Sequence, residues 1–67
     1  MTIFRVPGMK CGGCARRVTA ALKGADPSAE VQVDLQRREV TVTSIADGER
    51  LDLALREAGY AGERLMG

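Results

Sequence analysis

Apolar and polar residues alternate in several short segments of this chain. In EVQVDL the residues Val31, Val33 and Leu35 fall on one face of an extended chain, and EVTVTS repeats the pattern. Only residues 36–38 separate these two segments, which predicts a β-hairpin. Alternation of this kind is typical of a sheet that is covered on one face only. Strands are expected over residues 2–6, 30–35, 39–44 and 61–66.

Two other segments repeat apolar residues at the spacing of an amphipathic helix. The first helix is expected over residues 13–23, with Gly24 as the left-handed residue just past its end. The second is expected over residues 48–58, with Asp47 as its N-cap and Gly59 as the residue that stops it. The apolar stripes consist of Cys14, Val18, Ala21 and Leu22 in the first helix and Leu51, Ala54, Leu55 and Ala58 in the second.

The resulting order, βαββαβ, predicts an α+β fold of the ferredoxin-like type. We expect one domain over residues 1–67, with a four-stranded antiparallel sheet and two helices on one of its faces. Because each element reverses direction, the loop after the first strand, the hairpin tip and the loop before the last strand should share one end. This topology brings together Lys10, Cys11, Cys14, Arg37, Arg38 and Tyr60.

Composition and charge narrow the range of functions. The 67 residues carry a net charge of +1, without a basic run or an aromatic ladder, which argues against nucleic-acid binding. No apolar run approaches the length of a membrane span, so membrane insertion is not expected. The N-terminus lacks the pattern of a secretory signal. We therefore expect a cytoplasmic protein with reduced thiols.

The stretch GMKCGGCARRV contains both cysteines of the chain. Cys11 is expected in a loop and Cys14 in the first helical turn, where the positive helix end and nearby basic side chains favour thiolates. Gly12 and Gly13 should let the loop fold until both sulfurs face one point, and should leave room for a second protein. Two thiolates without any histidine suit a soft, low-coordinate ion, above all Cu(I). Structural zinc would require further ligands.

The residues around the cysteines, together with other segments of the chain, resemble a known family. The motif GMKCGGC, the helix with Val18 and the Ala-Leu pair 21–22, the hairpin VQVDLQRREVTV and the closing EAGY are similar to the heavy-metal-associated domain of copper chaperones and metal-transporting P-type ATPases. The resemblance implies the same βαββαβ fold and metal binding through Cys11 and Cys14. This chain departs from the family in having Ala29-Glu30-Val31 where a glycine-valine pair is common, and Lys10 where threonine or serine is common.

Several residues near the cysteines have two interpretations. Met9 could be a thioether ligand, but the resemblance implies that it packs beneath the loop. Tyr60 either only caps the second helix or shields the sulfurs and donates a hydrogen bond to a thiolate. The basic residues either form a solvated face or dock an acidic partner, and we favour docking. They are Lys10, Arg16, Arg17, Arg37 and Arg38.

The function that these observations predict is carriage of Cu(I), not catalysis. The expected partner is a metal-transporting P-type ATPase or another metal-binding domain, which would take the ion by thiolate exchange. The chain should be monomeric without metal, and a metal-bridged dimer stays open. Two alternatives also stay open. One is another soft ion, such as Hg(II), Ag(I) or Cd(II), or Zn(II), in the same site. The other is a small thiol-disulfide redox protein.

Overall fold

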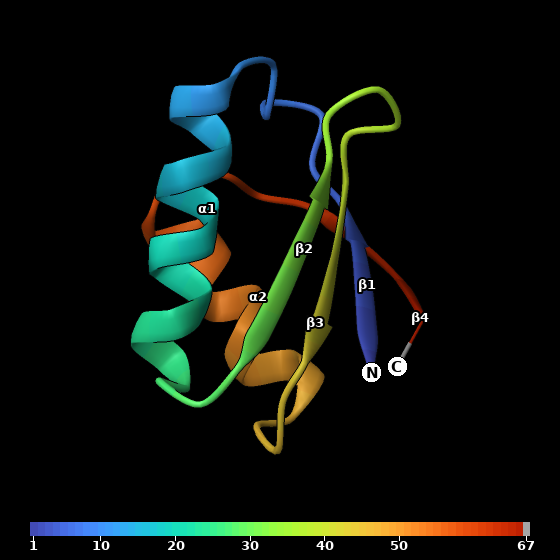
Figure 1. The fold of residues 1–67 in the computed structure, drawn as a ribbon. Coiled ribbons are helices and arrows are strands. Elements are labelled where there is room, and N and C mark those ends of the chain that lie inside the picture. Colours follow the sequence, from blue (N-terminus) through green and yellow to red (C-terminus); the bar gives the residue numbers. More distant parts are fainter. Residues whose placement is uncertain (67) are drawn as a thin grey trace.

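The computed structural model describes residues 1–66 and contains six elements in the predicted order (Figure 1). The elements are β1 (Thr2–Arg5), α1 (Gly12–Ala25), β2 (Glu30–Asp34), β3 (Glu39–Thr43), α2 (Gly48–Glu57) and β4 (Glu63–Met66). Each lies within two residues of the segment expected from the alternation of apolar and polar positions.

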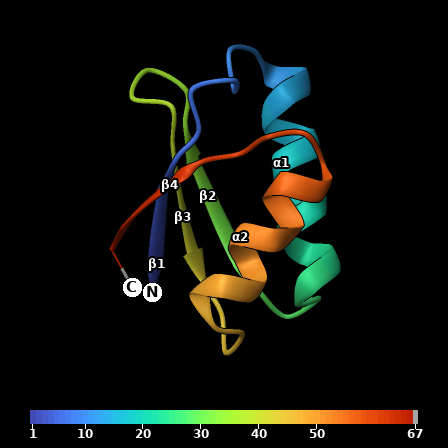
Figure 2. The ribbon, with the colours of Figure 1, turned by 180° about the vertical axis from the view of Figure 1, so that it is seen from behind.

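The four strands form one antiparallel sheet in the order β2-β3-β1-β4. Phe4 on β1 lies opposite Val40 on β3, and Val31 on β2 lies opposite Val42. Both helices cover the same face of this sheet, as the two opposite views show (Figures 1 and 2). The expected ferredoxin-like arrangement is therefore confirmed.

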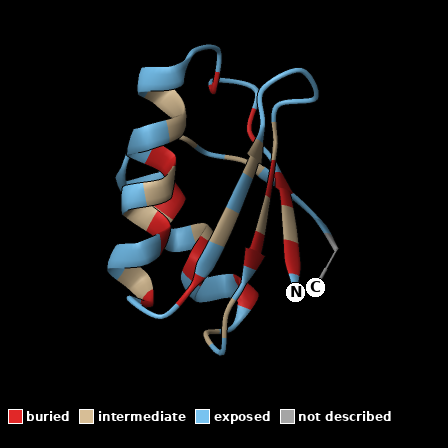
Figure 3. Ribbon diagram, viewed as in Figure 1, coloured by how far each residue is buried: buried red, intermediate tan, exposed pale blue. Residues whose placement is uncertain are grey.

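The core fills the space between the sheet and the helices (Figure 3). Its largest members are Phe4 and Met9, both fully buried, and aliphatic side chains supply the rest. The other buried apolar residues are Val6, Val18, Leu22, Ala29, Val40, Val42, Leu51 and Leu55. Such a core, one layer thick, is what a chain of this length can build.

The end of α1 differs from the sequence-based expectation, and the assignment of Gly24 as a left-handed terminal residue is wrong. The helix continues through Gly24 to Ala25, and the N–H of Asp26 still donates to the carbonyl of Leu22 at 3.1 Å. The turn is made instead by Asp26, whose carboxylate accepts from the N–H of Ser28 at 3.0 Å. A side chain that pairs with the backbone two residues on replaces the glycine.

Two apolar positions also lie outside the core that the periodicity predicts. Leu35 was expected to face inward at the end of β2, but it begins the hairpin turn and is 41% exposed. The turn takes four residues, Leu35–Arg38, and Arg38 adopts a left-handed φ of 55° to close it. Ala58 follows the last residue of α2 as its C-cap and is exposed.

Both ends of α2 follow the sequence-based prediction. The Asp47 side chain accepts a hydrogen bond from the N–H of Arg50 at 2.9 Å, as an N-cap does. At the other end Gly59 adopts a φ of 87°. Its N–H donates to Arg56, and the N–H of Tyr60 donates to Leu55 at 2.9 Å. These two bonds form a Schellman motif, which fixes the direction in which the chain leaves the helix.

The described helices are too short and too polar to cross a lipid bilayer.

Candidate metal site

The two cysteines lie at the N-terminal end of α1, in the positions expected for them. Cys11 is the N-cap residue and exposed, and Cys14 lies in the first turn and is partly buried. Both thiols are free, and their Sγ atoms lie 3.3 Å apart. Two sulfurs this close, on one exposed helix end, can contact a single ion.

The surroundings of Cys14 favour its thiolate. They lower the pKa of the Cys14 thiol from 9.0 to about 7. A hydrogen bond with the Tyr60 side chain is the largest cause, followed by one with the Cys11 thiol. The backbone of Lys10 and that of Cys11 add smaller effects, while desolvation opposes them. Donors that converge on one sulfur stabilise its anionic form, the form that ligates metal ions.

Tyr60 reaches the cysteines because the end of α2 directs it there. It directly follows Gly59 in the Schellman motif, and its ring is partly buried against the core. The ring also borders the loop before α1, since a Cβ built on Gly8 would lie 3.8 Å from Tyr60 Cδ1. Tyr60 therefore lies between the end of α2 and the sulfurs, as the topology predicts.

Arg17 belongs to the same cluster. Its pKa is raised, first by a hydrogen bond with Tyr60 and by that side chain's charge, and then by the charges of Cys14 and Cys11. The sequence analysis expects Arg17 among the basic side chains that favour the thiolates, as well as in the basic face. In the structure its guanidinium lies close enough to stabilise negative charge on the sulfurs. One turn of helix separates Cys14 from Arg17, and side chains at this spacing lie on the same face of a helix.

Met9 and the glycines between the cysteines differ in what they do. Met9 is fully buried in the core, as the packing interpretation expects. Gly12 and Gly13 are helical, and neither has the positive φ that would require glycine. A Cβ at Gly12 would meet nothing within 4 Å, and one at Gly13 would be at an ordinary 3.9 Å from Cys11 Sγ. The backbone between the two cysteines therefore does not require glycine at these positions, contrary to the expectation that glycine lets it fold. The absence of side chains at Gly12 and Gly13 still leaves the sulfurs uncovered.

The basic residues share one end of the molecule but not one contact network. The hairpin tip and the start of α1 lie at the same end, as expected (Figure 1). At the tip, Arg37 Nε lies 4.0 Å from the Asp34 carboxylate, and the carbonyl of Arg38 accepts from the N–H of Val6. Lys10 and Arg16 are exposed near the cysteines. Of the five, Arg17 is the one that the structure joins to Tyr60 and the sulfurs.

Gly62 is a positioning residue that the sequence analysis missed. A Cβ at this position would lie 2.8 Å from the carbonyl oxygen of Arg5 and 3.2 Å from Cγ2 of Val6. Only glycine lets the connection from α2 to β4 cross so close to β1. This connection carries Tyr60, so Gly62 helps to place it. A single glycine two residues after Tyr60 gives no sequence signal of such a crossing.

The protein itself offers a small donor set. Among residues 1–66, no group of three or more His, Cys, Asp or Glu side chains is arranged to hold a metal ion. The two thiols are thus the donors that this end of α1 provides. Such a pair suits an ion that accepts two soft ligands, and it does not complete the four-ligand shell of structural zinc.

Comparison with known proteins gives consistent matches. The profile of the heavy-metal-associated domain matches residues 3–61. Copper-transporting ATPase 2 of Rhizobium meliloti (strain 1021) is 39% identical over an alignment of 60 residues, and the match covers 85% of this chain and 7% of that protein. The chain therefore spans a small part of this curated relative.

Solved structures match over nearly their whole length. The copper chaperone Atx1 from Synechocystis PCC6803 superposes with a TM-score of 0.91 and is 41% identical, over 94% of this chain and 100% of that one. A gold binding protein superposes with a TM-score of 0.92 and is 31% identical, over 96% and 98% of the two chains.

Proposed function

Since this chain belongs to the heavy-metal-associated domain family, we propose that it binds Cu(I) through Cys11 and Cys14 and delivers it to another protein. The observation that carries the proposal is the pair of free sulfurs, 3.3 Å apart at an exposed helix end. The family is a metal-binding one, and delivery of an ion by ligand exchange requires no enzymatic reaction.

The chemistry of the site favours Cu(I) over harder ions. Cu(I) prefers soft thiolates and accepts few ligands, and among the described residues no third His, Cys, Asp or Glu side chain joins the two sulfurs. Two thiolates and one Cu(I) leave a net charge of −1, which the Arg17 guanidinium offsets. The similarity to a copper chaperone and to part of a copper-transporting ATPase supports the same ion.

Transfer would proceed by exchange of one thiolate for another. A thiolate of the partner forms a bond to the bound Cu(I), giving a three-coordinate intermediate. The bond to one donor sulfur then breaks, and the ion keeps its charge throughout. Cys11 would leave first because it is exposed and precedes the helix, while Cys14 stays anchored in the first turn. Gly12 and Gly13 leave the approach open.

The partner in this proposal is a metal-transporting P-type ATPase or another metal-binding domain with an acidic surface. Lys10, Arg16 and Arg17 would meet it beside the sulfurs, and Arg37 and Arg38 would meet it from the hairpin tip. Opposite charges increase the rate of encounter and orient the two proteins. We place this exchange in the cytoplasm, where the thiols stay reduced.

Titration of the reduced protein with Cu(I) against a chromophoric competing chelator tests the proposal. We expect one ion per chain, bound with a dissociation constant of about 10⁻¹² M or below. Replacing Cys11 or Cys14 by serine should weaken binding by orders of magnitude. Intact binding in Cys14→Ser would contradict the proposed site. One ion per two chains would indicate a bridged site. Cu(I) bound no more tightly than by a loose dithiol would contradict copper and turn the test to Hg(II), Ag(I), Cd(II) and Zn(II).

A thiol-disulfide function is a second candidate, favoured by the short Sγ–Sγ distance and the lowered pKa of Cys14. A low pKa and a neighbouring second thiol are the features of a redox pair. The reduction potential of the Cys11–Cys14 couple and turnover by a thioredoxin-type reductant would separate this function from metal carriage.

A further inference from the structure

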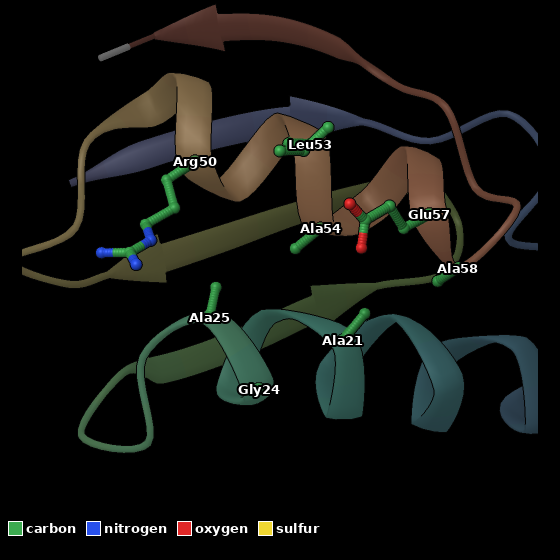
Figure 4. A pocket seen from close by; sticks show the side chains of 8 residues that line it. All are labelled: Ala21, Gly24, Ala25, Arg50, Leu53, Ala54, Glu57 and Ala58. Atoms are coloured by element: carbon green, nitrogen blue, oxygen red, sulfur yellow. The ribbon is translucent and has the colours of Figure 1, made fainter.

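A shallow groove runs between α1 and α2, away from the cysteines (Figure 4). Its volume is about 510 Å³. Small residues line it: Ala21, Gly24 and Ala25 from α1, Ala54 from α2, and Ala58, the C-cap of α2. Small side chains let another helix approach closely, so this part of the surface is shaped to receive a larger side chain.

Four residues of α2 form a stripe along this groove. Arg50, Leu53, Ala54 and Glu57 follow the i, i+3, i+4, i+7 spacing, so they share one face of the helix. Leu53 is 57% exposed there. The ion pair that the structure shows on α2, within residues 1–66, joins Arg56 to Asp52 at 3.4 Å. Arg50 and Glu57 take part in none of the ion pairs described for this part of the chain.

The stripe is complementary to itself. Its midpoint lies between Leu53 and Ala54, and Arg50 and Glu57 lie equally far from that midpoint in opposite directions. A two-fold axis through the midpoint, perpendicular to α2, would place two α2 helices antiparallel. Arg50 of each copy would then face Glu57 of the other, and Leu53 of each copy would cover the other copy's Ala54. Two-fold interfaces require this kind of self-complementarity.

We propose that the α1–α2 groove is the contact surface of a metal-independent homodimer, in which Leu53 of a second copy occupies the groove. Charge complementarity identifies the occupant, because a positive and a negative end on one stripe are matched by the same stripe turned around. The surface of one helix pair is small compared with stable interfaces, so the dimer is weak and depends on protein concentration.

This dimer differs from one bridged by metal, and it also departs from the sequence-based expectation of a monomer in the absence of metal. The axis reverses the direction of both helices, so the two copies direct their cysteine ends in opposite directions. The groove and the sulfurs lie on different parts of the molecule, and both are accessible at once. Dimerisation through the groove therefore requires neither cysteine and no ion, and the test uses the reduced protein free of metal.

Sedimentation velocity over a wide concentration series, from micromolar to millimolar, tests the proposal. We expect the wild type and a Cys11→Ser/Cys14→Ser variant to dimerise equally. Arg50→Glu places two glutamates opposite each other, and Glu57→Arg places two arginines there. Each should weaken dimerisation by about tenfold or more. The double variant Arg50→Glu/Glu57→Arg exchanges the two charges and should restore dimerisation to within a few-fold of the wild type.

Glu30→Arg is the matched control, because it makes the same change of charge as Glu57→Arg on β2, outside the groove. It should leave dimerisation unchanged. A wild type that stays monomeric throughout the series would overturn the proposal. So would a double variant that stays as weak as the single ones, or a Glu30→Arg variant that is impaired as strongly. Circular dichroism of each variant confirms that it is folded.

Discussion

Tyr60 links two elements that are distant in sequence. The backbone of α2 fixes its position through the Schellman motif, and its side chain acts on Cys14 and Arg17 at the start of α1. One side chain thus transmits the geometry of the second helix to the sulfurs of the first. Its effect on the Cys14 thiol is electrostatic, and a titration can isolate that effect.

Tyr60→Phe removes the hydroxyl and keeps the ring. We expect the pKa of the Cys14 thiol to rise above its present value of about 7, because the largest stabilising hydrogen bond is lost. The ultraviolet absorbance of the thiolate, followed against pH in Cys11→Ser backgrounds with and without the substitution, measures this shift. An unchanged pKa would show that the ring, not the hydroxyl, is what the site uses.

Gly62→Ala tests the close crossing of the α2–β4 connection over β1. The added Cβ would meet the Arg5 carbonyl oxygen at 2.8 Å, so we expect a loss of about 1–3 kcal/mol in the free energy of unfolding. Gly24→Ala is the matched control. It lies in the helix with nothing within 4 Å, and should stabilise the fold by about 0.5–1 kcal/mol. Urea unfolding measures both, and equal effects would contradict the crossing.

At the scale of elements, Asp26 ties together the two connections at the end of the molecule remote from the cysteines. Its carboxylate accepts from the Ser28 N–H in the α1–β2 connection and from the Ser44 hydroxyl, at 2.5 Å, in the β3–α2 connection. The residue is 8% exposed. The hydrogen bond from Ser44 is the largest of the effects that lower the pKa of Asp26.

This lowered pKa predicts a dependence of stability on pH. Since the folded pKa lies below the unfolded one, the carboxylate stabilises the fold above the unfolded pKa, near 4. The contribution is lost as the pH falls through the lower, folded value. Asp26→Asn should therefore reduce stability at neutral pH and flatten its fall in acid. Urea unfolding at several pH values measures this, with Ser44→Ala as the partner variant. The same acid dependence in Asp26→Asn would assign it to other carboxylates.

The sequence predicts elements well where periodicity and local capping agree. The alternating valines of β2 and β3, the cap at Asp47 and the left-handed Gly59 all follow from short-range rules. The approach of Tyr60 to the cysteines follows from topology alone. These features depend on residue spacing and on the reversal of direction between elements, both of which can be read from one sequence.

Other features depend on contacts between distant segments, which spacing does not encode. Gly24 could equally end or continue a helix, and the Asp26 side chain decides the outcome by making the turn itself. Leu35 fits the strand pattern, but the hairpin requires it in the turn. The need for glycine at position 62 arises from the carbonyl of Arg5, which lies far away in the sequence.

At the scale of the whole molecule, the proposed metal site joins both helices. Its two sulfurs belong to the start of α1, and Tyr60 belongs to the end of α2. The start of β1 and the end of β4 lie at the end of the sheet remote from the cysteines (Figure 1). Because both helices must be folded to form this site, an ion held by Cys11 and Cys14 would stabilise the folded state against unfolding of the whole core.

Cu(I) should therefore raise the melting temperature of the reduced protein. A free ion concentration one hundred times the dissociation constant stabilises the fold by about 2.7 kcal/mol, which for a domain of this size is roughly 10 °C or more. Differential scanning calorimetry with and without a Cu(I) buffer measures the shift. Cys11→Ser/Cys14→Ser should show none, and an equal shift in that variant would locate the ion elsewhere.

The uncovered first turn of α1 has a consequence for the direction in which an ion would be transferred. Cys11 is exposed, and Gly12 and Gly13 place no side chain over the sulfurs. In the proposed exchange, an incoming thiolate would therefore use the same opening through which the ion leaves. Such an opening would let the ion pass in either direction, and the net direction of the proposed exchange would follow the ratio of the two affinities and the loading of each protein. The ion would then move from the protein that binds it more weakly to the one that binds it more strongly, and a strong final acceptor would set the direction.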